Sequence, residues 1–102
     1  MGRILFERDE AKAQSNVRKH GVSFELARSV LVDACALTEQ DRFVGGEARW
    51  RTVGLAITGT VLFVAHTSQD KGEHELVRII SARRATRSER NLYGQNRAKH
   101  IS

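Results

Sequence analysis

The sequence contains no proline and a single cysteine, Cys35, among its 102 residues. One cysteine excludes a disulfide within the chain and favours a reducing compartment, so we expect a cytoplasmic protein. No hydrophobic run approaches the ~20 residues that a membrane-spanning helix needs, and the N-terminus becomes charged at Arg3, unlike a secretory leader. The four histidines are scattered along the chain, a spacing that predicts no zinc site. We therefore expect no metal and no cofactor.

The remaining composition is that of an ordinary globular domain, with 40% hydrophobic and 28% charged residues. A chain of this length buries enough surface for one core without a disulfide or a structural metal. There are no repeats and no linker. Beyond Gly94 the sequence is polar and is expected to fray. We predict one domain over residues 1–94 and a polar tail over 95–102.

The net positive charge comes entirely from the second half of the chain. Residues 1–50 carry eight Lys/Arg and eight Asp/Glu, whereas residues 51–102 carry nine and four, which gives the whole net charge of +5. Most of this excess is arginine, which binds phosphate through a planar fork of donors. A polyanionic partner and a merely solvated basic surface are both consistent with this distribution.

Hydrophobic periodicity predicts an α+β fold. We expect a small antiparallel sheet of about four strands, with two N-terminal helices and one C-terminal helix covering one face. Strands are predicted at 3–7, 47–57, 61–67 and 75–82, with a weaker one at 34–40; helices at 10–19, after Ser23 and from 83; and loops at 41–46 and 68–74.

Two arginines alternate along the strand predicted at 47–57. Arg49 and Arg51 share one face about 7 Å apart and can bracket a phosphate. The competing interpretation is an exposed strand face whose arginines pair with acids. Glu47 is the nearest acid; it can act as a base, but a salt bridge to Arg49 is favoured. Trp50, on the other face, can stack on a nucleobase, although packing under a loop is the simpler interpretation.

The segment from 78 to 93 changes from a strand pattern to a helix pattern. Arg78 lies among aliphatic residues of the strand and needs a partner or a concave open face. Arg83 is placed at the strand-to-helix switch, where free helical N–H groups favour an anion, and is the best phosphate-binding candidate. Arg87 and Arg90 share its helix face and are candidate RNA-binding residues. Glu89 falls on the apolar side, where we expect an arginine partner.

His66 ends the strand predicted at 61–67 and can serve as a general acid or base. A lone strand histidine is more often structural. Both interpretations of His66 stay open at this point.

Two blocks of this sequence resemble a known family, the BrnT-type toxins. The first runs from Lys19 to Glu25 and the second from Arg78 to Tyr93. The matching residues are Phe6-Glu7, Asp9, Lys12-Ala13, Asn16, Lys19 to Glu25 and Ala27, then Glu47, Arg49, Val53-Gly54, His66-Thr67, Arg78 to Arg83, Ala85, Glu89-Arg90 and Tyr93. The resemblance covers residues 4–93 in the right order.

This resemblance implies a type II toxin–antitoxin component with a fold like the RelE ribonucleases. It implies an enzyme that cleaves RNA and arrests bacterial growth until a cognate BrnA-like antitoxin, typically of ribbon-helix-helix type, covers its basic face. Metal-free cleavage then assigns Arg83, Arg49, His66, Arg78 and Glu47 to catalysis, and Arg51, Arg87, Arg90 and Trp50 to RNA binding.

The chain departs from the family pattern at a few positions. Arg8 stands where the family usually has tryptophan, the usual proline is missing at Asp33-Ala34, and Phe43-Val44 replaces a common His-Ser pair. Two alternatives therefore stand beside the enzyme: a non-catalytic nucleic-acid-binding or regulatory protein, and a degenerate toxin that retains only antitoxin binding.

Overall fold

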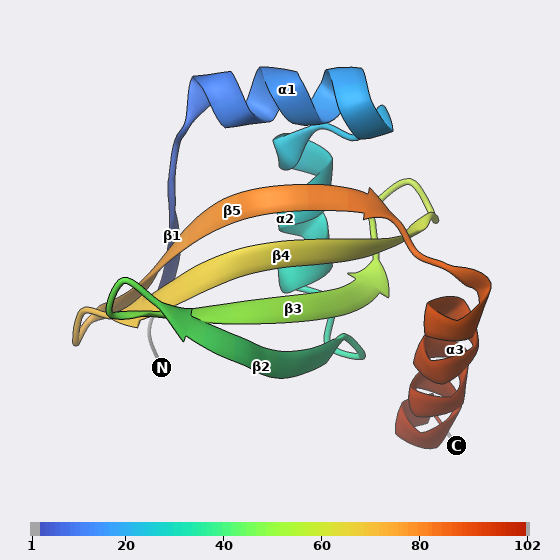
Figure 1. Ribbon diagram of the computed structural model, residues 1–102. Coiled ribbons are helices and arrows are strands. Elements are labelled where there is room, and N and C mark those ends of the chain that lie inside the picture. Colours follow the sequence, from blue (N-terminus) through green and yellow to red (C-terminus); the bar gives the residue numbers. More distant parts are fainter. Residues whose placement is uncertain (1–2, 102) are drawn as a thin grey trace.

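Three helices pack on a five-stranded sheet in the computed structural model, which describes residues 3–101 (Figure 1). The elements are β1 (Arg3–Glu7), α1 (Glu10–His20), α2 (Phe24–Leu31), β2 (Leu37–Val44), β3 (Glu47–Leu55), β4 (Val61–Asp70), β5 (His74–Arg84) and α3 (Arg87–Ile101). The predicted α+β class is confirmed, with five strands in place of about four. None of the helices in this part of the chain is long and apolar enough to cross a membrane.

The strands lie in the order β1-β5-β4-β3-β2. Strands β2 to β5 form antiparallel pairs, as predicted, but β1 lies parallel to β5. A parallel pair needs a long crossover connection, and here all the elements from α1 to β4 lie between the two strands. The N-terminal strand β1 therefore forms one edge of the sheet, beside the last strand β5. Local sequence patterns do not reveal this pairing.

Several strand boundaries differ from the prediction. The segment 41–46, expected as a loop, is mostly strand, because β2 continues to Val44. Asp41 is an extra residue at a register shift in the pairing of β2 with β3. Only Gly45 and Gly46 form the turn, both at positive φ, as short hairpin turns require. The expected loop at 68–74 shrinks in the same way to residues 71–73. The polar side chains of the edge strand β2 and of the end of the interior strand β4 look like loop residues in a sequence.

The C-terminal helix begins later than predicted. Strand β5 continues to Arg84, so Arg83 belongs to the strand, and α3 starts at Arg87. The N–H of Thr86 donates to Oε1 of Glu89, and the N–H of Glu89 donates to Oγ1 of Thr86, which is a capping box. Residues 95–101, expected to fray, continue the helix, and Asn96 donates to the carbonyl of Cys35 at 2.9 Å.

Helices α1 and α2 cover one face of the sheet. Each begins at a predicted cap: Asp9 accepts from the N–H of Lys12, and Ser23 accepts from that of Leu26. The apolar side of α2 packs against the middle strands, so we call this the covered face and the other the open face. The buried core comprises Val22, Phe24, Ala27, Val30, Ala56, Leu62, Val64, Ile79 and Ala82.

A buried amide joins α1 to the sheet where β1 ends. The side chain of Asn16 accepts from the N–H of Ala82 at 3.0 Å and donates to the carbonyls of Ala82 and Val22, each at 2.8 Å. It acts as a short substitute for a neighbouring strand, since a buried backbone edge must find hydrogen-bond partners. Asn16 thereby fixes the part of β5 that carries the candidate site.

Candidate active site

A bulge in β5 places two of the predicted arginines on the same face. Arg78 pairs with Thr67 of β4, and Arg83 pairs with Phe63. Side chains five positions apart on a regular strand point to opposite faces. The pairing shifts where Ala65 faces Ser81 and His66 faces Ile79, which leaves Ile80 as the extra residue. Arg78 and Arg83 therefore both point to the open face.

Strand β3 contributes two more arginines to the open face. Arg49 and Arg51 alternate with Trp50 and Thr52, and Thr52 is buried on the covered face. The sequence prediction that Arg49 and Arg51 share a face is confirmed. We call the open-face set of Arg49, Arg51, Arg78 and Arg83 the arginine row.

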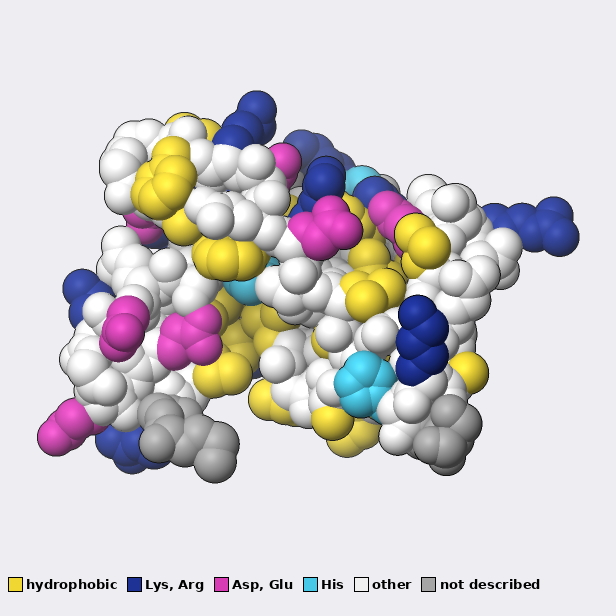
Figure 2. Space-filling view, turned by 90° about the horizontal axis from the view of Figure 1, so that it is seen from below, with side chains coloured by type: hydrophobic (Ala, Val, Ile, Leu, Met, Phe, Trp, Pro, Cys, Tyr) yellow, Lys and Arg dark blue, Asp and Glu magenta, His cyan; other side chains and the backbone are white. Residues whose placement is uncertain are grey.

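Three members of the arginine row have a carboxylate partner. Arg51 lies 3.2 Å from Glu39, Arg78 lies 2.7 Å from Glu47, and Arg83 lies 2.9 Å from Glu89. From the side of the edge strand β2, acidic and basic side chains are also interspersed, and hydrophobic side chains lie in the hollow between them (Figure 2). Three of the four arginines of the row are therefore charge-paired within the protein.

Arg49 is the exception within the row. It forms no ion pair with any residue that the structure describes, and its Nε is buried without a hydrogen-bond partner. A buried donor without an acceptor is energetically costly. Arg49 is thus the row member with unused capacity for an anion.

Glu47 holds a different arginine from the one predicted. Its Oε1 accepts from Nη2 of Arg78 at 2.7 Å, and its Oε2 accepts from Nε2 of Gln69 at 3.3 Å. The predicted salt bridge to Arg49 is not formed. The side chain nevertheless lies two residues before Arg49 on the same face of β3. It is the carboxylate that β3 itself supplies beside Arg49.

His66 lies away from the arginine row, on the covered face. Its Nε2 lies 2.8 Å from Oγ1 of Thr52, and its Nδ1 lies 3.2 Å from the carbonyl oxygen of Thr67. Because a carbonyl only accepts, Nδ1 carries the proton and Nε2 accepts from the threonine hydroxyl. Burial lowers the pKa of His66, so the ring is neutral at pH 7. The expected convergence of His66 with the arginines is not observed, and Trp50, its cross-strand neighbour, also points to the covered face.

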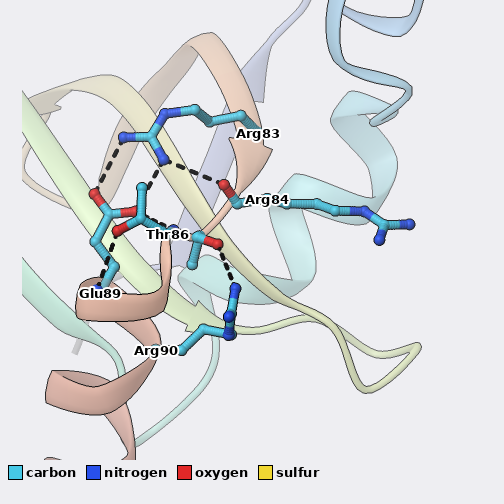
Figure 3. A network of polar contacts seen from close by, with 6 residues as sticks. Arg83, Arg84, Thr86, Glu89 and Arg90 are labelled. Carbon is cyan, nitrogen blue, oxygen red and sulfur yellow. Dashed lines mark hydrogen bonds and ion pairs between the residues drawn. The ribbon is translucent and has the colours of Figure 1, made fainter.

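Arg83 and Glu89 form a two-pronged ion pair that joins β5 to α3 (Figure 3). The guanidinium of Arg83 also lies over the ring of Phe63, 4.1 Å from its centroid. The hydrogen bond from Arg83 is the main reason why the pKa of Glu89 is lowered. The sequence correctly predicted an arginine partner for Glu89.

The predicted stripe of helical arginines is not a single surface. Arg83 lies on the strand, and Arg90 donates to the carbonyl of Ala85 at 2.8 Å. Arg87 is exposed in the first turn of α3, and Arg84 points away from the network in Figure 3. The arginines that the fold brings together come from β3 and β5, and from β2, whose Arg42 lies directly across from Arg49.

Comparison with known proteins identifies the class of protein to which this chain belongs. Residues 9–89 match the model of a family described as "Ribonuclease toxin, BrnT, of type II toxin-antitoxin system". The protein is thus a ribonuclease-type toxin of a type II toxin–antitoxin system. Within that class, the chain belongs to the BrnT family, as its two sequence blocks predicted. This membership implies an antitoxin partner and an RNA target.

The chain is similar to the solved structure of the ribonuclease toxin BrnT of Brucella abortus. The two are 22% identical, and the alignment covers 85% of this chain and 100% of the other, with a TM-score of 0.49. A search of curated proteins finds no match.

Proposed function

We propose that this protein is a metal-independent endoribonuclease that cleaves RNA on the open face of its sheet and arrests bacterial growth. The observation that supports the proposal best is the arginine row, in which Arg49 has no carboxylate partner among the described residues. An RNA phosphate is the anion that a ribonuclease must hold. Family membership favours a ribonuclease, and the arginine without an acid supports the open face as its RNA-binding surface.

The arginine row acts mainly by stabilising the negative charge that develops on the scissile phosphate. Arg49 binds the scissile phosphate and donates to its oxygens as negative charge builds up on them. One such pre-aimed donor contributes about 3–4 kcal/mol to transition-state stabilisation. Arg51 and Arg78 border this position and hold the neighbouring phosphates. Arginine does not lose its proton near neutral pH, so a different group must accept the proton.

Glu47 is the proposed proton acceptor. Its carboxylate takes the proton of the 2′-hydroxyl, and the 2′-oxygen then forms a bond to phosphorus in line with the departing 5′-oxygen. The bond from phosphorus to the 5′-oxygen breaks, and that oxygen takes a proton from solvent. The product is a 2′,3′-cyclic phosphate. In this mechanism His66 has a structural role, because its ring is buried on the other face.

The antitoxin is proposed to be a ribbon-helix-helix protein that inactivates the enzyme in the cytoplasm. The open face lies opposite α1 and α2, so a partner can reach the arginine row directly (Figure 1). A protein bound there blocks RNA and supplies acids for Arg49.

The cleavage assay uses single-stranded RNA in the presence of a chelator. We expect Arg49→Ala to lower the cleavage rate about 10²–10³-fold, whereas Arg18→Ala, which changes an exposed arginine of α1, leaves it close to wild type. Glu47→Gln is expected to lower the rate in the same assay with little change in the binding of an RNA that lacks free 2′-hydroxyls. Equal cleavage by wild type and Arg49→Ala would place the site elsewhere.

A second candidate is a chain that retains only RNA or antitoxin binding. It is favoured by the pairing of Arg51, Arg78 and Arg83 with acids, and by the position of His66 on the covered face. Wild-type protein that binds RNA, cleaves none and is harmless on expression would support this candidate.

A further inference from the structure

A small pocket opens at one end of the open face, between α3 and the strands β2, β3 and β4. Its volume is about 180 Å³. This is several times the ~30 Å³ that one water molecule occupies in the liquid. It is below the ~300 Å³ at which pockets for drug-sized ligands begin. The size suits one flat ring system. Its walls are the apolar side chains of Leu37, Val53, Phe63 and Leu92.

The rim of the pocket is charged. Glu39 and Arg51 form one side, in an ion pair exposed enough to rearrange at little cost. Glu89 forms the other side and is fixed, because Arg83 and the N–H of Thr86 both donate to its carboxylate. Its Oε2 accepts only from Arg83 among the described residues, so it can accept a second hydrogen bond.

The pocket is continuous with the arginine row through Arg51, which belongs to both. Arg49 lies two residues before Arg51 on the same face of β3, and the Cα atoms of the two are about 7 Å apart. The end of the pocket at Arg51 is therefore close enough for one nucleotide to place its phosphate at Arg49 and its base against this end of the pocket.

We propose that this pocket binds one nucleobase of the RNA, adjacent to the phosphate held by Arg49. This inference rests on the proposed function. Apolar walls and an aromatic ring match the faces of a base, and the carboxylate of Glu89 accepts a hydrogen bond from an N–H on the base edge. An aliphatic side chain from a protein partner would bury Glu89 and Arg51 without giving either a new partner, which is unfavourable. The charged rim therefore favours a base.

The test compares two ligands that share the same phosphates. One is a short 2′-O-methyl RNA, which cannot be cleaved because the attacking hydroxyl is blocked. The other is the same backbone with abasic residues. We measure both affinities by fluorescence anisotropy and take their ratio, so that changes in protein charge cancel. Wild type is expected to prefer the base-containing ligand about tenfold, the usual order for one base held by contact with an aromatic side chain.

Leu92 offers a suitable substitution because its side chain is 56% exposed. Leu92→Glu places a charge on the apolar wall, and we expect it to abolish the preference; Leu92→Ala removes wall area and should reduce the preference by less. The matched control is Val17→Glu, which changes an exposed aliphatic residue of α1, 48% exposed. It should keep the wild-type ratio.

The outcomes separate this proposal from the proposed function. If Leu92→Glu and Leu92→Ala both keep the wild-type ratio, the nucleobase site is overturned, and a protein side chain becomes the better occupant. If Arg49→Ala binds the abasic backbone as tightly as wild type does, the phosphate site fails, whatever the ratio shows. If wild type binds neither ligand, both proposals fail.

Discussion

The guanidinium of Arg83 reaches both carboxylate oxygens of Glu89, with Nη1 to Oε1 at 2.9 Å and Nη2 to Oε2 at 3.1 Å. This pair connects the end of β5 to the first turn of α3. The sequence had made Arg83 the best candidate for binding phosphate. Its donors are instead committed within the protein, and its flat side covers Phe63. The structure thus shifts the proposed phosphate-binding role to Arg49.

We expect Arg83→Lys to destabilise the protein more than it impairs cleavage. Lysine keeps the charge but cannot bond both oxygens of Glu89 at once or lie flat on Phe63. The loss in the free energy of unfolding should be about 1–2 kcal/mol, measured by urea denaturation. Arg84→Lys, at an exposed neighbouring side chain, serves as the control. A loss of cleavage as large as that of Arg49→Ala, without loss of stability, would return Arg83 to the centre of the site.

His66 should make the protein less stable as the pH falls from 7 to 5. Burial lowers the pKa of His66 in the folded state, so protons bind more readily to the unfolded chain. The stabilisation is complete above the unfolded pKa of about 6.5 and is lost as the pH falls toward the folded pKa, by at most about 1.4 kcal/mol per pH unit. His66→Gln, which can still bond Thr52, should flatten this slope in thermal or urea unfolding. An unchanged slope in His66→Gln would show that the ring titrates normally.

Two glycines should respond in opposite directions to replacement by alanine. A Cβ at Gly54 would lie 3.0 Å from Cγ1 of Val30 and 3.1 Å from Oδ2 of Asp33. That carboxylate is held by the N–H of Leu55 and the hydroxyl of Tyr93 and cannot move freely. Gly54→Ala should therefore cost about 1–3 kcal/mol. Gly94→Ala, in open space on α3, should gain about 0.5–1 kcal/mol from helix propensity. Equal effects of the two changes in urea denaturation would contradict this reading of the packing at Gly54.

Local patterns were enough to predict most of the elements. The caps at Asp9 and Ser23 act within a few residues of themselves, so their effect is visible in the sequence. Polar side chains misled the prediction at 41–46, on the edge strand β2, and at 68–74, where the interior strand β4 ends. The start of α3 was predicted too early because the strand β5 continues through Arg83 and Arg84.

The sequence by itself determined that this is a small α+β domain whose net positive charge comes from its second half, and its two motif blocks identified the BrnT family. It also placed Arg49 and Arg51 on one face, because alternation is a local property of a strand. Only the tertiary structure decided which arginines meet and which remain without an acid. The bulge at Ile80 reverses the alternation between Arg78 and Arg83, and pairing across β4 places His66 on the far face. Bulges and ion-pair partners depend on strands distant in sequence, and such contacts exist only once the sheet has formed.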